Sequence, residues 1–97
     1  MKRTDNQPEI VKEEEKVCGN VIYRYRLIRA KSLKVASYLM PLYSIHVSLT
    51  RDGITTENSL ENVFSDIGKA LVFFEQISKN LATPADLPYI LEDKISL

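Results

Sequence analysis

The chain has 97 residues, of which 44% are hydrophobic and 27% are charged, and its 13 basic and 13 acidic side chains give no net charge. This length supports one small core and leaves no room for a second one, and the composition is that of a globular domain. The single cysteine, Cys18, excludes an intrachain disulfide framework and is typical of a reducing compartment.

The charges are unevenly distributed along the chain. Residues 21–37 carry five basic side chains and no acidic one, whereas residues 38–97 carry eight acidic and four basic side chains. This asymmetry indicates either an anion-binding patch or two parts of one fold that neutralise each other. The second interpretation is the commoner one, and the first stays open.

Residues 1–18 are predicted to be a flexible charged arm, followed by a single small α+β domain over residues 19–97. The arm has almost no large apolar residue and ends in the run Lys12-Glu13-Glu14-Glu15-Lys16, so it cannot bury enough surface to offset its ordering entropy. A short helix over residues 9–16 is the alternative. Neither a secretory signal nor an apolar run of the roughly 20 residues that a membrane span needs is present, so we expect a cytoplasmic protein with no membrane contact.

Residues 21–29 alternate as a strand does. One face is expected in the core and holds four apolar or aromatic residues: Val21, Tyr23, Tyr25 and Leu27. Arg24 and Arg26 lie on the opposite, wetter face, although Ile22 and Ile28 place apolar groups at both of its ends. Residues 30–37 are the connection, which Leu33 and Val35 could shorten by extending the flanking strands.

The second strand is expected over residues 43–49, with Tyr43, Ile45, Val47 and Leu49 on its core face. Asp52-Gly53 then predicts a hairpin, because both central positions of a type I′ turn need positive φ. A two-residue loop pairs Leu49 with Thr56 and Ile45 with Leu60. A three-residue loop would turn Leu60 to the wet side, so the register favours two residues.

Residues 64–81 are predicted to form a helix that covers this sheet. Its apolar face has helical spacing, and Phe73 lies on the shoulder of that face. The members of the face are Ile67, Ala70, Leu71, Phe74, Ile77 and Leu81. Ser65 is the expected N-cap and Asn80 the expected C-cap.

A second helix is expected after Thr83-Pro84, with a threonine cap, proline in the first turn and Asp86 at the capping-box position. Pro88 predicts an irregular or 3₁₀ first turn, and Leu87, Ile90, Leu91 and Ile95 form the buried stripe. The predicted architecture is therefore β-β-β-α-α, a three-stranded antiparallel meander with two C-terminal helices packed on one face.

Several motifs resemble an uncharacterised family of short proteins from spore-forming, mostly anaerobic bacteria. They are Tyr25-Arg26-Leu27 in the first strand, Tyr43-Ser44-Ile45-His46-Val47 in the second, and the closing segment from Pro84-Ala85-Asp86-Leu87 to Ile90-Leu91-Glu92-Asp93. The likeness covers about residues 23–95. It implies the same order of elements and brings no catalytic residue to this chain.

The residues that carry common chemistries are scattered. His46 and Cys18 lie in separate segments without metal-ligand spacing, and Gly19, Gly53 and Gly68 form no phosphate-binding loop. Ser44, His46 and Ser48 share a strand face, but no acid is evidently placed to complete a nucleophilic site. We therefore expect no enzyme activity, no cofactor and no metal.

Two functions are left for testing. The first is a protein-interaction module that could also self-associate, because some apolar residues exceed what a two-layer core needs: Ile22, Ile28, Val72 and Phe73. The alternative is weak anion or nucleic-acid binding by a basic patch on and after the first strand. Its candidate residues are Arg24, Arg26, Arg29, Lys31, Lys34 and His46.

Overall fold

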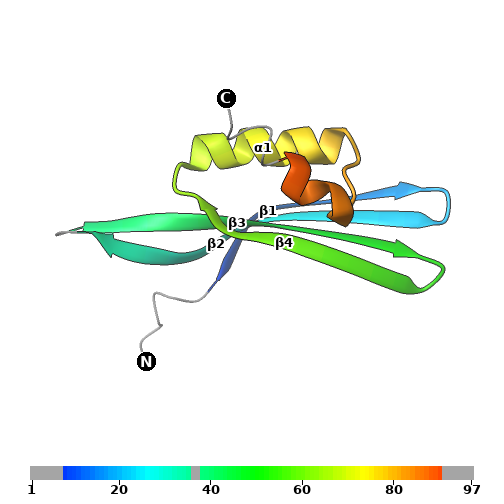
Figure 1. Cartoon of the computed structure of the whole chain (residues 1–97), viewed down its shortest axis with the longest axis horizontal. Coiled ribbons are helices and arrows are strands. Elements are labelled where there is room, and N and C mark those ends of the chain that lie inside the picture. The colour runs from blue at the N-terminus through cyan, green and yellow to red at the C-terminus, as the bar shows by residue number, and fades with distance from the viewer. Residues whose placement is uncertain (1–7, 36–37, 91–97) are drawn as a thin grey trace.

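The protein is a four-stranded antiparallel sheet with helices on one face (Figure 1). The computed structural model describes residues 8–35 and 38–90, and of residues 30–35 and 38–40 it describes the backbone alone. The elements in chain order are β1 (Glu9–Cys18), β2 (Val21–Val35), β3 (Tyr38–Arg51), β4 (Ile54–Phe64), α1 (Ile67–Lys79) and the 3₁₀ turn η1 (Pro84–Asp86). The predicted α+β class is confirmed.

The prediction of three strands is wrong, because Glu9–Cys18 forms the edge strand β1 instead of a mobile arm. Residues 1–7 of the predicted arm lie outside the described residues. The strand forms although it buries no side chain fully. It pairs along its whole length with β2, and Gly19, at φ 63°, turns the chain between the two. The strand β1 is therefore stabilised by backbone pairing and side-chain partners on β2 and not by apolar burial.

The sheet is a meander in which each strand pairs with its neighbour in the chain, in the order β1-β2-β3-β4. The turn predicted at Asp52-Gly53 is confirmed, with φ of 54° and 79° at its two residues. The predicted register is confirmed too, since Leu49 pairs with Thr56 and Ile45 with Leu60. The β2–β3 hairpin extends to Val35 and Tyr38, as Leu33 and Val35 suggested.

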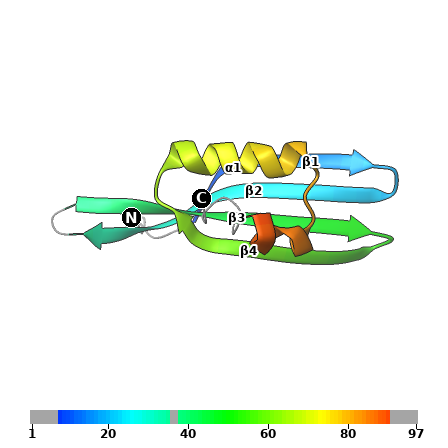
Figure 2. The same cartoon turned by 45° about the horizontal axis from the view of Figure 1, so that its top comes forward.

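The core lies between the sheet and the helices, which cover the same face (Figures 1 and 2). The expected alternation on β2 and β3 is confirmed, because Tyr25, Leu27 and Ile45 have no exposed surface. From the helical layer, the core receives Ala70, Phe73, Phe74, Ile77, Ala82 and Leu87. The apolar arc of α1 is therefore rotated from the predicted one: Phe73 is a core residue, whereas Ile67 is 38% exposed.

The ends of α1 follow capping chemistry. Asp66 is the N-cap, and its carboxylate accepts a hydrogen bond from the Gly68 N–H at 2.8 Å. The prediction of Ser65 as the cap is wrong by one residue, because the helix begins at Ile67 and the cap is the residue immediately before it. Asn80 is the C-cap as predicted, and its side-chain amide donates to the Gln76 carbonyl at 2.9 Å.

The segment after α1 is anchored to the sheet by two hydrogen bonds. The buried Tyr25 hydroxyl donates to the Ala82 carbonyl at 2.9 Å, and the Asn58 amide donates to the Pro84 carbonyl at 3.1 Å. The predicted 3₁₀ start is confirmed as η1, with the Thr83 N–H donating to Asp86 at 3.1 Å. Residues 87–90 are helical with Leu87 buried. Leu91 and Ile95 lie outside the described residues.

Candidate interaction face of the sheet

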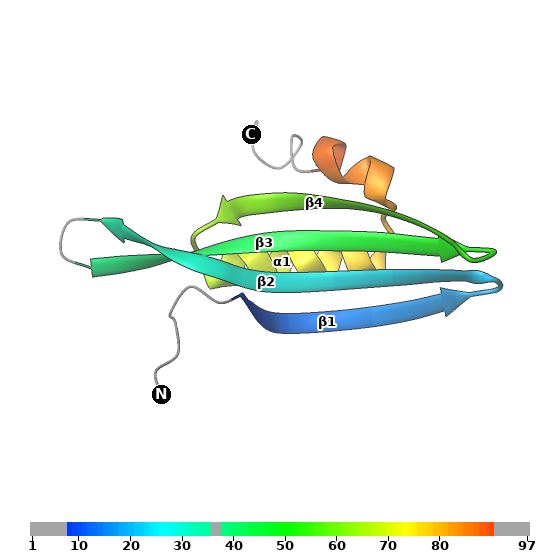
Figure 3. The ribbon, with the colours of Figure 1, turned by 90° about the horizontal axis from the view of Figure 1, so that it is seen from below.

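The sheet face opposite the helices is the candidate site, and we call it the open face. Viewed from this side, the four strands lie in front of α1 (Figure 3). Strand pairing arranges its side chains in rows that run across the sheet. These rows are Val17–Ile22–Thr50–Thr55, Glu15–Arg24–Ser48–Glu57, Glu13–Arg26–His46–Ser59 and Ile10–Ile28–Ser44.

The arginines of β2 are each paired with an acid of β1. Arg26 Nε lies 2.7 Å from a Glu13 carboxylate oxygen, and Arg24 Nη2 lies 3.5 Å from Glu15. Arg29, at the far end of the pairing, forms an ion pair with Glu9. The predicted face shared by Arg24 and Arg26 is therefore present, but β1 supplies the opposite charge. Of the two interpretations of the uneven charge, this geometry favours neutralisation within the fold.

The remaining residues of the predicted basic patch add no further member to the row of arginines on β2 that pair with acids of β1. The side chains of Lys31 and Lys34 lie outside the described residues. His46 is half-buried, and its Nε2 lies 3.1 Å from a Glu61 carboxylate oxygen. The residues that we did not predict are Glu9, Glu13 and Glu15. The sequence before the Gly19-Asn20 turn carries no apolar alternation that would have marked them as strand residues.

Glu61 gathers a small polar network at an irregularity of β4. The Ser59 hydroxyl donates to its carboxylate at 2.8 Å, and this hydrogen bond, helped by nearby His46, holds the pKa of Glu61 below its ordinary value. The register slips after Leu60, where Asn62 adopts φ 55° and donates its N–H to the buried Ser44 hydroxyl at 2.8 Å. Ser44 therefore holds the bulge in place.

This network does not form a nucleophilic site. Ser59 donates to Glu61, so the carboxylate lies between serine and histidine, and the serine contacts a weakly basic carboxylate of lowered pKa instead of the imidazole. Within the described part of the chain, no three His, Cys, Asp or Glu side chains come together to hold a metal ion. A groove of about 200 Å³ lies on this face over Ser48, between Arg24 and Glu57. It is below the roughly 300 Å³ from which small-molecule sites begin.

The four residues predicted for an interaction surface do not lie together. Ile22 is half-buried on the open face, and Ile28 is buried beside Ile10. Phe73 is 3% exposed and packs with Phe64, so its assignment to a surface is wrong. Its position on the helix turns it to the sheet together with Ala70 and Ile77.

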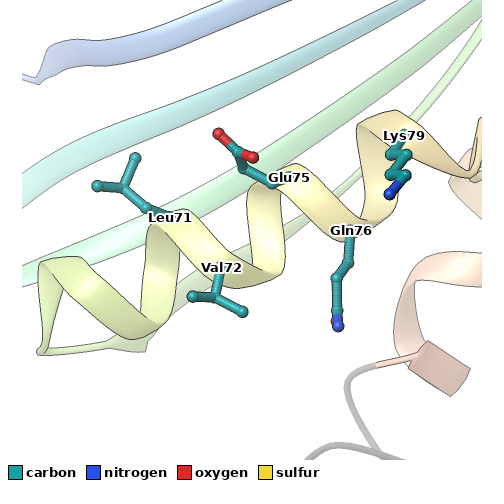
Figure 4. Close-up of a pocket in the computed structure, with 5 residues that line it drawn as sticks. All are labelled: Leu71, Val72, Glu75, Gln76 and Lys79. Carbon is teal, nitrogen blue, oxygen red and sulfur yellow. The ribbon is translucent and has the colours of Figure 1, made fainter.

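Val72 is exposed on the outer side of α1, 59% of its surface being accessible. A depression of about 430 Å³ follows this side along Leu71, Val72, Glu75, Gln76 and Lys79 (Figure 4). In that view Leu71 and Glu75 point to one side of the helix axis, and Val72 and Gln76 to the other. Glu75 is bound to Lys12 of β1 at 2.8 Å, which raises the pKa of Lys12 and lowers that of Glu75.

Comparison with known proteins gave one match. The model of a family of unknown function, DUF6514, matches residues 4–97. Neither a curated protein nor a solved structure matches the chain. Among the helices in the described ranges, none combines the length and apolar character needed to cross a bilayer.

Proposed function

Since the chain belongs to DUF6514, a family of unknown function, we propose from its geometry that it is a non-enzymatic protein-interaction module. The observation that carries this proposal is the open face, which none of the described helices covers and on which charged rows lie between two apolar pairs, Ile10–Ile28 and Val17–Ile22. A flat surface that mixes apolar and paired charged groups suits a macromolecular partner.

Binding is favoured over catalysis by the chemistry of the face. Its groove is small, and the serine nearest to His46 donates to Glu61, a carboxylate whose lowered pKa makes it a weak base. Protein is favoured over nucleic acid because Arg24 and Arg26 already have acidic partners, so neither arginine is a free cation for a phosphate.

We place this module in the cytoplasm, since a lone cysteine suits a reducing compartment. From the resemblance of the strand motifs to a family of such proteins, we propose a bacterial source among spore-forming and mostly anaerobic species.

The proposal is tested by photo-cross-linking in the native cell. A cross-linking residue at Ser48, in the middle of the open face, is expected to capture a protein that binds the chain again after purification. The same residue at Lys69, exposed on α1, is the matched control.

Self-association is the second form of the proposal and is measured by light scattering on the full chain. A concentration-dependent dimer whose copies cross-link through Ser48 would support it. A monomer at high micromolar concentration, together with no capture from Ser48, would overturn the proposed function.

A further inference from the structure

The two edges of the sheet differ in how they meet a further strand. Edge β1 carries the charged run from Lys12 to Lys16, and its register slips between Ile10 and Lys12. Charges and bulges are what proteins place on an edge to prevent strand addition. From Ile54 to Leu60, β4 pairs regularly with β3 and contains neither lysine nor proline. η1 lies beside β4 near Asn58, whose amide is bonded to the Pro84 carbonyl (Figure 3). The part of edge β4 from Ile54 to Glu57 is therefore the one suited to a further strand.

The outward backbone groups of β4 follow from its hairpin. Arg51 and Ile54 close a two-residue turn and exchange their hydrogen bonds, so alternate residues from Thr55 onwards direct their N–H and C=O away from β3. Ser59 agrees with this geometry, because its N–H donates to the Asn58 side chain at 2.8 Å. Within residues 8–35 and 38–90, no backbone group outside β3 bonds the outward groups of Thr55 and Glu57, so these groups can pair with a further strand.

The side chains of β4 define the charge of that strand. On the open face β4 presents Thr55, Glu57, Ser59 and Glu61, two acids without a base. Glu61 is bound to His46 and Ser59, whereas Glu57 has no ion pair within the described residues. At the other edge of the same open face, the acids of β1 lie beside the arginines of β2. A basic column beside β4 would repeat that arrangement.

A second copy of the chain does not supply a basic column. Its β4 would place Glu57 and Glu61 beside the same acids, and its β1 would bring Glu13 and Glu15 to the open face. Like charges on neighbouring strands are destabilising. The complementary occupant is a different chain.

We propose that edge β4 accepts an extended segment of another protein, added as a fifth strand, with lysine or arginine at alternate positions facing Glu57. This inference rests on the proposed function and names the partner's chemistry and its place on the sheet. Main-chain hydrogen bonds to Thr55 and Glu57 supply affinity, and the acidic column supplies selectivity.

The test uses the full chain and two synthetic peptides of about ten residues, the length of a long strand. In one, lysine alternates with valine and threonine, and in the other glutamate replaces lysine. We expect the lysine peptide to bind and to protect the Thr55 and Glu57 amides from hydrogen exchange. Its affinity is expected to fall as salt is added. A lysine peptide methylated at its backbone nitrogens is expected not to bind.

Two variants locate the site. Thr55→Pro removes an outward N–H and none that pairs with β3, so it is expected to block the added strand while the fold persists. Glu57→Lys keeps the backbone. It is expected to lower the affinity for the lysine peptide about tenfold and to allow the glutamate peptide to bind. This second variant keeps the proposal falsifiable even if the proline variant does not fold.

Binding of the lysine peptide that Glu57→Lys leaves unchanged, or no binding at all, would overturn this inference. Capture from Ser48 would in that case still support the proposed function. If neither peptide binding nor capture from Ser48 is observed, both this inference and the proposed function are overturned.

Discussion

The covered face and the open face of the same sheet are stabilised by different interactions. On the covered face, Tyr25, Leu27 and Ile45 are fully buried beneath α1. On the open face, Arg26 and Glu13 each keep 44% of their side-chain surface exposed and are held by an ion pair. Apolar burial contributes about 1.5–3 kcal/mol per large side chain, whereas an exposed cross-strand ion pair contributes about 0.2–1 kcal/mol. One face therefore determines stability, and the other, which contributes little to it, is the face for which we propose a role in recognition.

The largest effect is expected from the covered face. Phe74→Ala removes a fully buried ring from the core and should lower the free energy of unfolding by about 3–5 kcal/mol, measured by urea denaturation. Val72→Ala, on the exposed side of the same helix, is the control and should change it by less than about 0.5 kcal/mol. Equal losses for the two variants would contradict the division between the faces.

A smaller loss is expected from Tyr25→Phe, which leaves the buried Ala82 carbonyl without its donor. The expected cost is about 1–3 kcal/mol, with faster hydrogen exchange in residues 82–90. Burial raises the pKa of the Tyr25 phenol, so the unfolded chain ionises first and stability falls as the pH rises above the ordinary tyrosine value of about 10. Tyr25→Phe should lessen that dependence, and Tyr23→Phe is the control.

On the open face, the ion-pair ladder should contribute little. A double-mutant cycle with Glu13→Gln and Arg26→Gln is expected to give a coupling of about 0.2–1 kcal/mol that decreases with salt. The cycle of Glu13→Gln with Arg51→Gln, whose positions are not paired, should give none. A coupling as large as the Phe74→Ala loss would mean that this face also determines stability.

The smallest effect concerns one carboxyl group. Ser59→Ala removes the hydrogen bond that contributes most to the lowered pKa of Glu61, so that pKa should rise, as followed by NMR titration. A carboxylate with a lowered pKa adds stability above its unfolded value, and that stability is lost as the pH falls through the folded value. Ser59→Ala should lessen this acid-side loss. Ser48→Ala, on the same face, should leave the pKa of Glu61 unchanged.

The covered face was largely predictable from the sequence. Alternation marked Tyr25, Leu27 and Ile45, and Asp52-Gly53 set the register, because both signals are local and arise from strand and turn geometry. The rotation of α1 was less accessible. Phe73 and Leu71 flank the same arc, and only the position of the sheet determines which of them is buried.

The open face was predictable only in part. The sequence placed Arg24 and Arg26 together, but their partners belong to β1, which composition assigned to a mobile arm. A strand stabilised by ion pairs to a neighbouring strand has no apolar pattern of its own, so its existence becomes visible only with the pairing. Missing β1 therefore also meant missing Glu13 and Glu15.

The meander has a consequence for biosynthesis. Each strand pairs with the segment next to it in the chain, so hairpins can form one after another as the polypeptide emerges. The helix that covers the apolar side comes after all four strands, and until it is made that side stays in contact with water. The nascent chain is thus most vulnerable to aggregation, and most in need of a chaperone, in the interval between completing β4 and completing α1.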